Sequence, residues 1–181
     1  LDASISLSLK NFDQSIFQND SILYLEGYLF DKTETKQAMI DLCKIARNKG
    51  SVICLSLSDS FCVERHRNDF LSLIKKYVDI LFGNEQEIKV LLNGDVKEKV
   101  NSLVEIAVVT SGAKGANIFN ANDRVFIPPM DGLNVVDTTG AGDLFASGFL
   151  FGLSKKLTLY ECGKLATTGA SHIIQQYGAR P

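Results

Sequence analysis

Asp143 stands directly after a glycine-rich turn, at the start of a run of apolar residues with helical spacing. Residues 136–143 read Val-Asp-Thr-Thr-Gly-Ala-Gly-Asp, which predicts a strand, a tight turn and a helix entry. The amides that open a helix have no intrahelical partner, and the helix dipole adds positive charge there, so this turn suits a phosphate. A carboxylate at such a site repels the ligand unless it takes part in the reaction. Asp143 is placed to accept the proton of a hydroxyl that attacks the phosphate.

The plainer interpretation is that Asp143 is a first-turn acid that complements the helix dipole. A lone Gly-x-Gly-Asp favours this plainer interpretation. The full string, however, resembles Asp-Thr-x-Gly-Ala-Gly-Asp, the C-terminal signature of the ribokinase, or PfkB, family of carbohydrate and nucleoside kinases. It matches that signature at every position. The resemblance implies that Asp143 is the catalytic base. It also implies that the amides of Gly140, Ala141 and Gly142 form the anion hole for the moving phosphoryl group, and that Thr138 contacts the nucleotide.

Composition fits one soluble globular domain. The chain has 181 residues, 45% of them hydrophobic and 22% charged, and 19 basic against 21 acidic side chains give a net charge of −2. This balance argues against nucleic acid or an anionic membrane as a partner, and no apolar stretch or leader pattern predicts membrane insertion. The cysteines, with no Cys-x-x-Cys pair and no companion histidine spacing, are expected to be reduced and mostly buried in a cytoplasmic protein; they are Cys43, Cys54, Cys62 and Cys162.

Strands are expected to alternate with helices along most of the chain. Continuous apolar runs predict buried strands at 22–25, 52–55, 80–82 and 106–109, and a hairpin of 118–119 with 125–127. Helical spacing predicts helices at 33–48, 70–78, 96–103, 142–153 and 159–177. The alternation predicts an α/β fold, an open and mostly parallel sheet with helices on both faces, as one nucleotide-binding domain over 1–181. Ligands of such sheets bind beyond the carboxyl ends of the strands.

Asn84 and Glu87 follow the strand expected at 80–82. Their spacing predicts a helix cap by Asn84, with Glu87 closing a capping box. The same residues resemble the family's Asn-x-x-Glu element, which implies that Asn84 helps to hold the phosphates and that Glu87 acts on Mg²⁺ through water. Both interpretations hold together, because a capped helix end can also face a metal ion.

Thr110, Gly112 and Gly115 follow the strand expected at 106–109. A Gly-x-x-Gly at a strand end is by itself an ordinary turn. The residues resemble the family's Thr-x-Gly-x-x-Gly, in which the hydroxyl meets the nucleotide phosphates and the glycines leave room for them. Lys114 does not make a Walker P-loop, because no Gly-Lys-Ser or Gly-Lys-Thr is present.

Further positions follow from the resemblance or from their surroundings. Thr167 aligns with a position at which relatives have an adenine-facing His or Asn. The resemblance therefore implies that Thr167 binds the nucleotide, although a threonine departs from the family pattern there. The family also implies a K⁺ site near Asp137 and the Thr139 carbonyl. His66, between charged residues, is expected on a solvated helix face, and His172 is expected to pack within a helix.

The resemblance covers nearly the whole chain as the C-terminal, nucleotide-binding part of such a kinase. The N-terminal segment that recognises the substrate is expected outside these residues. The implied activity is transfer of the ATP γ-phosphate to a hydroxyl of a small sugar or nucleoside. Adenosine or a related nucleoside comes first, because residues 55–58, 78–85 and 157–162 resemble the adenosine kinase branch. A sugar kinase of ribokinase or fructokinase type and a non-catalytic, regulatory nucleotide-binding module stay open, as does the oligomeric state.

The sequence argues against a third class, the dinucleotide-binding Rossmann enzymes. Such enzymes carry Gly-x-Gly-x-x-Gly after the first strand, and this chain has none there.

Overall fold

The computed structural model describes residues 7–94, 100–121 and 123–180. The chain divides into two compact units, Leu1–Val108 and Val109–Pro181, here called the first and second units. The single nucleotide-binding domain over 1–181 stays a prediction.

The described strands confirm the expected class of open α/β sheet. They are β1 (Ile22–Glu26), β2 (Val52–Ser56), β3 (Ile80–Asn84), β4 (Ile106–Thr110), β5 (Ala116–Phe119) and β6 (Arg124–Ile127), in the order β1-β2-β3-β4-β5-β6. β1, β2 and β3 pair in parallel, and β5 and β6 form the expected antiparallel hairpin. The parallel strands are apolar because both faces of a parallel sheet are covered by other elements.

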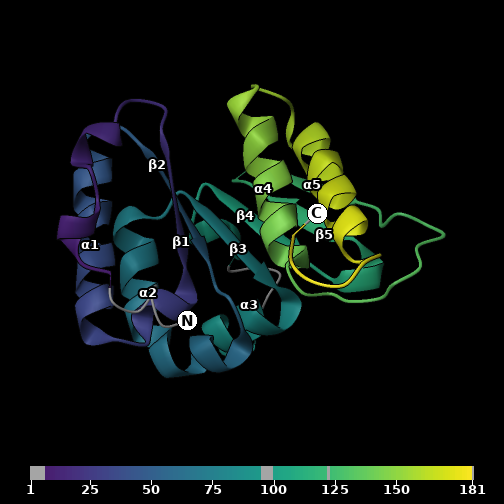
Figure 1. Cartoon of the computed structure of the whole chain (residues 1–181), viewed down its shortest axis with the longest axis horizontal. Helices are drawn as coiled ribbons and strands as arrows, with labels where there is room; N and C mark the ends of the chain where they lie inside the picture. The colour runs from purple at the N-terminus through teal and green to yellow at the C-terminus, as the bar shows by residue number, and fades with distance from the viewer. Residues whose placement is uncertain (1–6, 95–99, 122, 181) are drawn as a thin grey trace. The chain divides into compact units, whose positions relative to one another are not determined.

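Three α-helices belong to the described part of the first unit: α1 (Thr33–Asn48), α2 (Ser60–Tyr77) and α3 (Glu85–Leu92) (Figure 1). Short 3₁₀ turns are η2 (Leu9–Asn11), η3 (Gln14–Ile16), η4 (Gly27–Phe30) and η5 (Val100–Ser102). Since α1 and α2 each link neighbouring parallel strands in the same direction, right-handed crossovers place both on one face of β1–β3. Their apolar sides bury Leu42 and Phe70 completely, as Leu55 is buried in β2.

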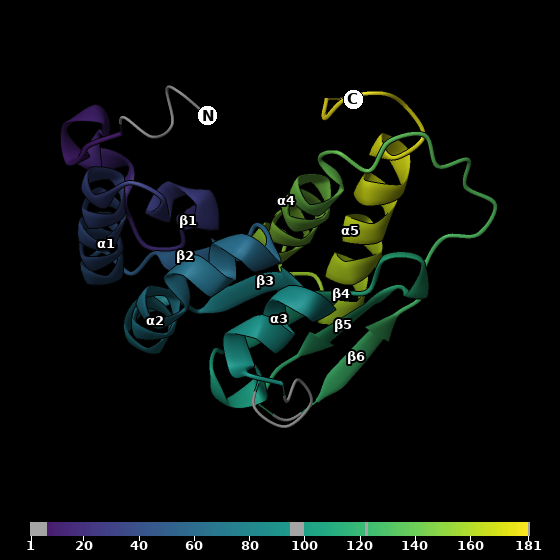
Figure 2. The ribbon, with the colours of Figure 1, turned by 90° about the horizontal axis from the view of Figure 1, so that it is seen from below.

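The second unit is built on two helices that touch through glycine. α4 (Ala141–Ser154) lies beside α5 (Leu159–Ile173), and a Cβ added to Gly148 of α4 would lie 2.8 Å from the carbonyl oxygen of Leu165 (Figure 1). α5 also covers the β5–β6 hairpin, because a Cβ on Gly163 would come within 2.5 Å of Ile127 (Figure 2). These close approaches fix the axis of α4, which carries the glycine turn at its start.

The strand expected at the start of the 136–143 motif is wrong. Residues 133–138 have no regular secondary structure, and the amides of Val136 and Asp137 donate to the carbonyl of Ile174 at 2.8 and 3.3 Å. The segment is therefore fastened to the end of α5 and pairs with no strand. The β-branched residues that suggested a strand are partly exposed, Val136 by 37%.

Two helices begin or end at residues other than the expected ones. α2 begins at Ser60, well before 70, because the Asp59 carboxylate accepts the Cys62 amide at 2.7 Å and caps the helix. α5 ends at Ile173, where the chain turns to meet Val136. Half of the helix expected at 96–103, residues 96–99, lies outside the described residues, and the described half contains the 3₁₀ turn η5.

The cysteines are all free and buried, as expected. Both histidine expectations are wrong. His172 is exposed, and the His66 side chain is only 15% exposed because its Nε2 lies 2.7 Å from Asp31 Oδ1. His66 also follows Cys62 by one helical turn, a companion spacing that the cysteine analysis missed.

No helix of the described residues combines the length and the apolar character needed to cross a membrane.

Candidate functional site

The glycine turn before α4 needs glycine at position 140. Gly140 is the N-cap of α4 with φ of 80°, a left-handed conformation, and a Cβ there would lie 3.0 Å from Ala179 Cα. The turn is closed by its own backbone: the Ala141 amide donates to the Thr138 carbonyl at 3.1 Å, and the Leu144 amide donates to the Gly140 carbonyl at 3.0 Å. The amide of Ala141 is thus used inside the turn.

The open side of the same turn, formed by Gly142 and Asp143, faces solvent. In the first turn of α4, the Gly142 amide has no intrahelical carbonyl to bond. A Cβ added at Gly142 would meet nothing within 4 Å, and both residues are exposed. Packing against the described residues therefore does not explain glycine at 142, whereas close approach by a ligand would.

The Asp137 carboxylate also stabilises the turn, through hydrogen bonds. Its Oδ1 accepts the amide and the hydroxyl of Thr139 at 2.9 and 2.7 Å, and its Oδ2 accepts the Gly178 amide at 3.1 Å. These hydrogen bonds, first that of the Thr139 hydroxyl, hold the pKa of Asp137 below its ordinary value. Three donors already balance this carboxylate without a cation, so the K⁺ site at Asp137 and Thr139 stays a prediction.

The loop after β4 contains one glycine that packing requires and one that it does not. Thr110 ends β4, and the turn η6 (Gly112–Lys114) follows. Gly115 has φ of 87°, and a Cβ there would collide with the Ile127 carbonyl oxygen. Gly112, with φ of 55°, has nothing within 4 Å of an added Cβ. A side chain at Gly112 would therefore meet open space, while the space at Gly115 is filled by the protein's own backbone.

A pocket of about 250 Å³ lies between the segment after β6 and helix α5. It is lined by Ile127, Pro128, Pro129, Met130, Lys164, Thr167 and Thr168. The Thr167 hydroxyl oxygen is buried and has no hydrogen-bond partner among the described residues. Apolar walls with a few polar groups are typical of ligand pockets. Thr167 lines this pocket, while its hydroxyl oxygen lies buried behind the pocket surface.

In the first unit, Asn84 and Glu87 form the expected capping box of α3. Asn84 Oδ1 accepts the Glu87 amide at 2.9 Å, and Glu87 Oε2 accepts the Asn84 amide at 2.9 Å. Glu87 is only 6% exposed, and burial raises the pKa of its carboxyl above the ordinary value.

Two acidic residues that the sequence analysis passed over lie at the neighbouring strand ends. Glu26 ends β1 and Asp59 follows β2, and the charges of both add to the raised pKa of Glu87. The Ser58 hydroxyl donates to Glu26 Oε2 at 3.0 Å, and Tyr28 donates to Asp59. Glu26 directly follows its predicted strand and Asp59 lies in the short loop after the next one, so position beyond a strand end was the signal that could have found both acids. A buried carboxylate with two acidic neighbours fits Mg²⁺ held through water, since a divalent cation would offset their repulsion.

The Glu87→Gln variant separates the metal role from the cap. Gln retains the capping acceptor but not the charge, so we expect the Mg²⁺ concentration for half-maximal rate to rise while the melting temperature changes little. Kinase assays over a Mg²⁺ series and thermal melts measure the two effects.

Glu161→Gln is the matched control, because Glu161 closes the same kind of capping box with Thr158 at the start of α5. It should leave the Mg²⁺ requirement unchanged. An unaltered Mg²⁺ requirement in Glu87→Gln would instead mean that the capping box alone explains Glu87.

Comparisons with known proteins agree with this arrangement. The solved structure of a probable sugar kinase from Rhizobium etli CFN 42 is 39% identical, covers 98% of this chain and 55% of its own, and gives a TM-score of 0.93. The solved structure of adenosine kinase from Sinorhizobium meliloti is 37% identical in sequence. The match covers 98% of this chain and 56% of that one, with a TM-score of 0.93. A cytidine kinase from Thermococcus kodakarensis is 32% identical over 73% of this chain and 50% of its own length.

The chain spans about half the length of the curated relatives it matches. Over residues 3–181 it also matches the description "pfkB family carbohydrate kinase". Because that match runs through every motif described above, the chain belongs to the pfkB family of carbohydrate kinases.

Proposed function

We propose that the protein carrying this chain transfers the γ-phosphate of ATP, as its Mg²⁺ complex, to a hydroxyl of a nucleoside or small sugar. The observation that carries the proposal is the open side of the glycine turn. There an exposed carboxylate, Asp143, stands next to a glycine that no packing in the described residues requires. A protein that only binds phosphate gains nothing from a carboxylate at that place, whereas a phosphotransferase needs a proton acceptor.

In this mechanism Asp143 accepts the proton of the attacking hydroxyl. The transition state of phosphoryl transfer is loose, so the hydroxyl is deprotonated late and an ionised, well-placed acceptor suffices. The Gly142 amide and the positive end of α4 stabilise charge on the moving group, at about 3 kcal/mol per donor by analogy with oxyanion holes. Glu87 would hold Mg²⁺ through water, and the ion would supply charge neutralisation for the phosphates.

The pocket at Thr167 is proposed to take the nucleobase of ATP. Its apolar wall of Pro128, Pro129 and Met130 fits a flat ring. The Thr167 hydroxyl is buried without a partner among the described residues, and a rotation of its side chain would turn it towards a polar edge of the base. Lys164 adds a positive charge to the lining.

Thr167→Val keeps the side-chain shape and removes the hydroxyl. We expect ADP to bind about 3- to 10-fold more weakly, as the loss of one hydrogen bond predicts, with unchanged or higher protein stability because an unpaired buried group is removed. Calorimetric titration and thermal melts measure both.

Thr168→Val is the control for this variant, since Thr168 lines the same pocket but its hydroxyl donates to the Lys164 carbonyl at 2.9 Å. Equal ADP affinity in the wild type and Thr167→Val would remove the hydroxyl from base recognition.

Adenosine or a related nucleoside is the first acceptor to test, because an adenosine kinase and a cytidine kinase are among the similar proteins. A sugar is the alternative, since a probable sugar kinase is equally similar in fold. The experiment measures ATP consumption with adenosine, cytidine, other nucleosides, ribose and fructose. Binding of ATP with no consumption in any mixture would favour the regulatory module. A cytoplasmic location with reduced thiols is part of the same proposal.

A further inference from the structure

A cluster of Asp31, Cys62 and His66 lies in the first unit, and no step of the proposed reaction uses it. Cys62 and His66 are one turn apart on α2, and Asp31 directly follows η4. One ligand atom from each, a carboxylate oxygen, the thiol sulfur and a ring nitrogen, lies within 4.8 Å of the other two. We propose that these three side chains bind one Zn²⁺ ion.

The donor set is one that zinc prefers. Zn²⁺ takes sulfur, imidazole nitrogen and carboxylate oxygen at about 2.0–2.3 Å, usually with four ligands in tetrahedral arrangement. Small side-chain rotations would bring the three atoms to such distances, and the contact between His66 Nε2 and Asp31 Oδ1, now 2.7 Å, would be replaced by two bonds to the ion. The Asp31 side chain is 33% exposed, so ions can enter and water can fill the fourth position.

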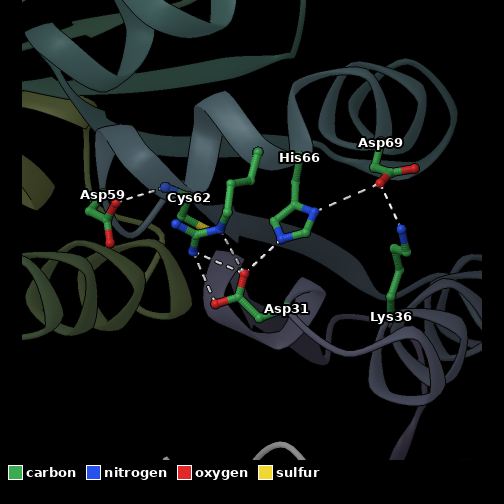
Figure 3. A network of polar contacts seen from close by, with 7 residues as sticks. Asp31, Lys36, Asp59, Cys62, His66 and Asp69 are labelled. Atoms are coloured by element: carbon green, nitrogen blue, oxygen red, sulfur yellow. Dashed lines mark hydrogen bonds and ion pairs between the residues drawn. The ribbon is translucent and has the colours of Figure 1, made fainter.

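A carboxylate also stands behind the histidine. His66 Nδ1 lies 3.9 Å from Asp69 Oδ2, and Asp69 is itself held by Lys36 at 2.8 Å. Figure 3 shows His66 between Asp31 and Asp69. Metal-bound histidines nearly always donate their second ring N–H to such a partner, which orients the ring and makes the ligand more basic. The 3.9 Å separation is too long for that hydrogen bond, and a small rotation of the Asp69 side chain would form it.

Charged side chains around the cluster affect whether its ligands pair with one another or with a metal ion. Arg65 donates to both oxygens of Asp31, at 2.9 and 3.1 Å from Nη2, and competes with a cation. Asp31 Oδ2 can keep Arg65 while Oδ1 turns to the ion. The Asp59 carboxylate, which accepts the Cys62 amide at 2.7 Å, adds negative charge beside the cluster and favours a cation there.

The test uses Co²⁺ as a spectroscopic substitute for Zn²⁺ in the reduced, metal-free 181-residue chain. We expect one equivalent of Co²⁺ to produce a thiolate-to-cobalt charge-transfer band, Zn²⁺ to abolish it, and Zn²⁺ to raise the melting temperature by fastening residue 31 to α2. Cys62→Ala should lose the band, and Cys54→Ala, which removes another buried thiol, should keep it.

Asp69→Asn covers the case in which Cys62→Ala fails to fold, because Asp69 is half exposed and is not a ligand. It should weaken Co²⁺ binding by about 10- to 100-fold, the usual effect of losing a carboxylate behind a ligating histidine. Absence of the band in the wild type, its survival in a folded Cys62→Ala variant, or unchanged affinity in Asp69→Asn would each overturn the proposal. No nucleotide or turnover is involved, so these results are independent of the kinase assignment.

Discussion

Asp143→Asn is expected to lower kcat of the kinase by about 10²-fold or more, because loss of a general base costs that much, while ATP still binds. Asn keeps the size of the side chain and the start of α4, so the fold and the phosphate-binding amides are retained. Steady-state assays with the best acceptor and a separate ATP titration measure the two effects.

Asp131→Asn is the matched control, an exposed aspartate of the same unit that lies outside the glycine turn. It should leave kcat unchanged. If Asp143 only complemented the dipole of α4, its replacement would cost about 0.3–1 kcal/mol of stability and leave turnover near normal. That pair of results would contradict the catalytic assignment.

Gly142→Ala is expected to separate stability from activity. A Cβ at this position meets nothing within 4 Å, so the protein should fold and become more stable by up to about 1 kcal/mol, the difference in helix propensity between alanine and glycine. Activity should nevertheless fall by about 10²-fold, because the added methyl displaces the phosphoryl group from its aligned position. Melting temperature and kcat/KM report the two changes.

The control for Gly142→Ala is Ser147→Ala, an exposed position farther along α4. It adds helix propensity without entering the first turn and should leave kcat/KM unchanged. Full activity in Gly142→Ala would mean that the ligand does not approach the turn at this residue, and the open space there would lose its functional meaning.

The local patterns of the sequence predict those parts of the site that are held together locally. The capping box of Asn84 and Glu87 was read from two residues, because its hydrogen bonds join positions three apart. The turn at Gly140 and the start of α4 were read in the same way. The strands were found because a buried parallel strand is continuously apolar.

The features that sequence reasoning missed depend on contacts distant in the chain. The segment at Val136 is held by the Ile174 carbonyl at the end of α5, which no local pattern contains, and its β-branched residues therefore wrongly predict a strand. The pocket beside Thr167 needs the segment after β6 as its second wall. The spacing of Cys62 and His66 was visible in the sequence, but Asp31 comes from another segment and joins them only in the fold.

The most direct test of the central claim follows the γ-phosphorus of isotopically labelled ATP in the presence of Mg²⁺ and each candidate acceptor. The account predicts that the label appears in a phosphomonoester of a nucleoside or sugar, and that Asp143→Asn nearly abolishes this product. Label that stays in ATP, or that appears only as inorganic phosphate while ATP is bound, would contradict it.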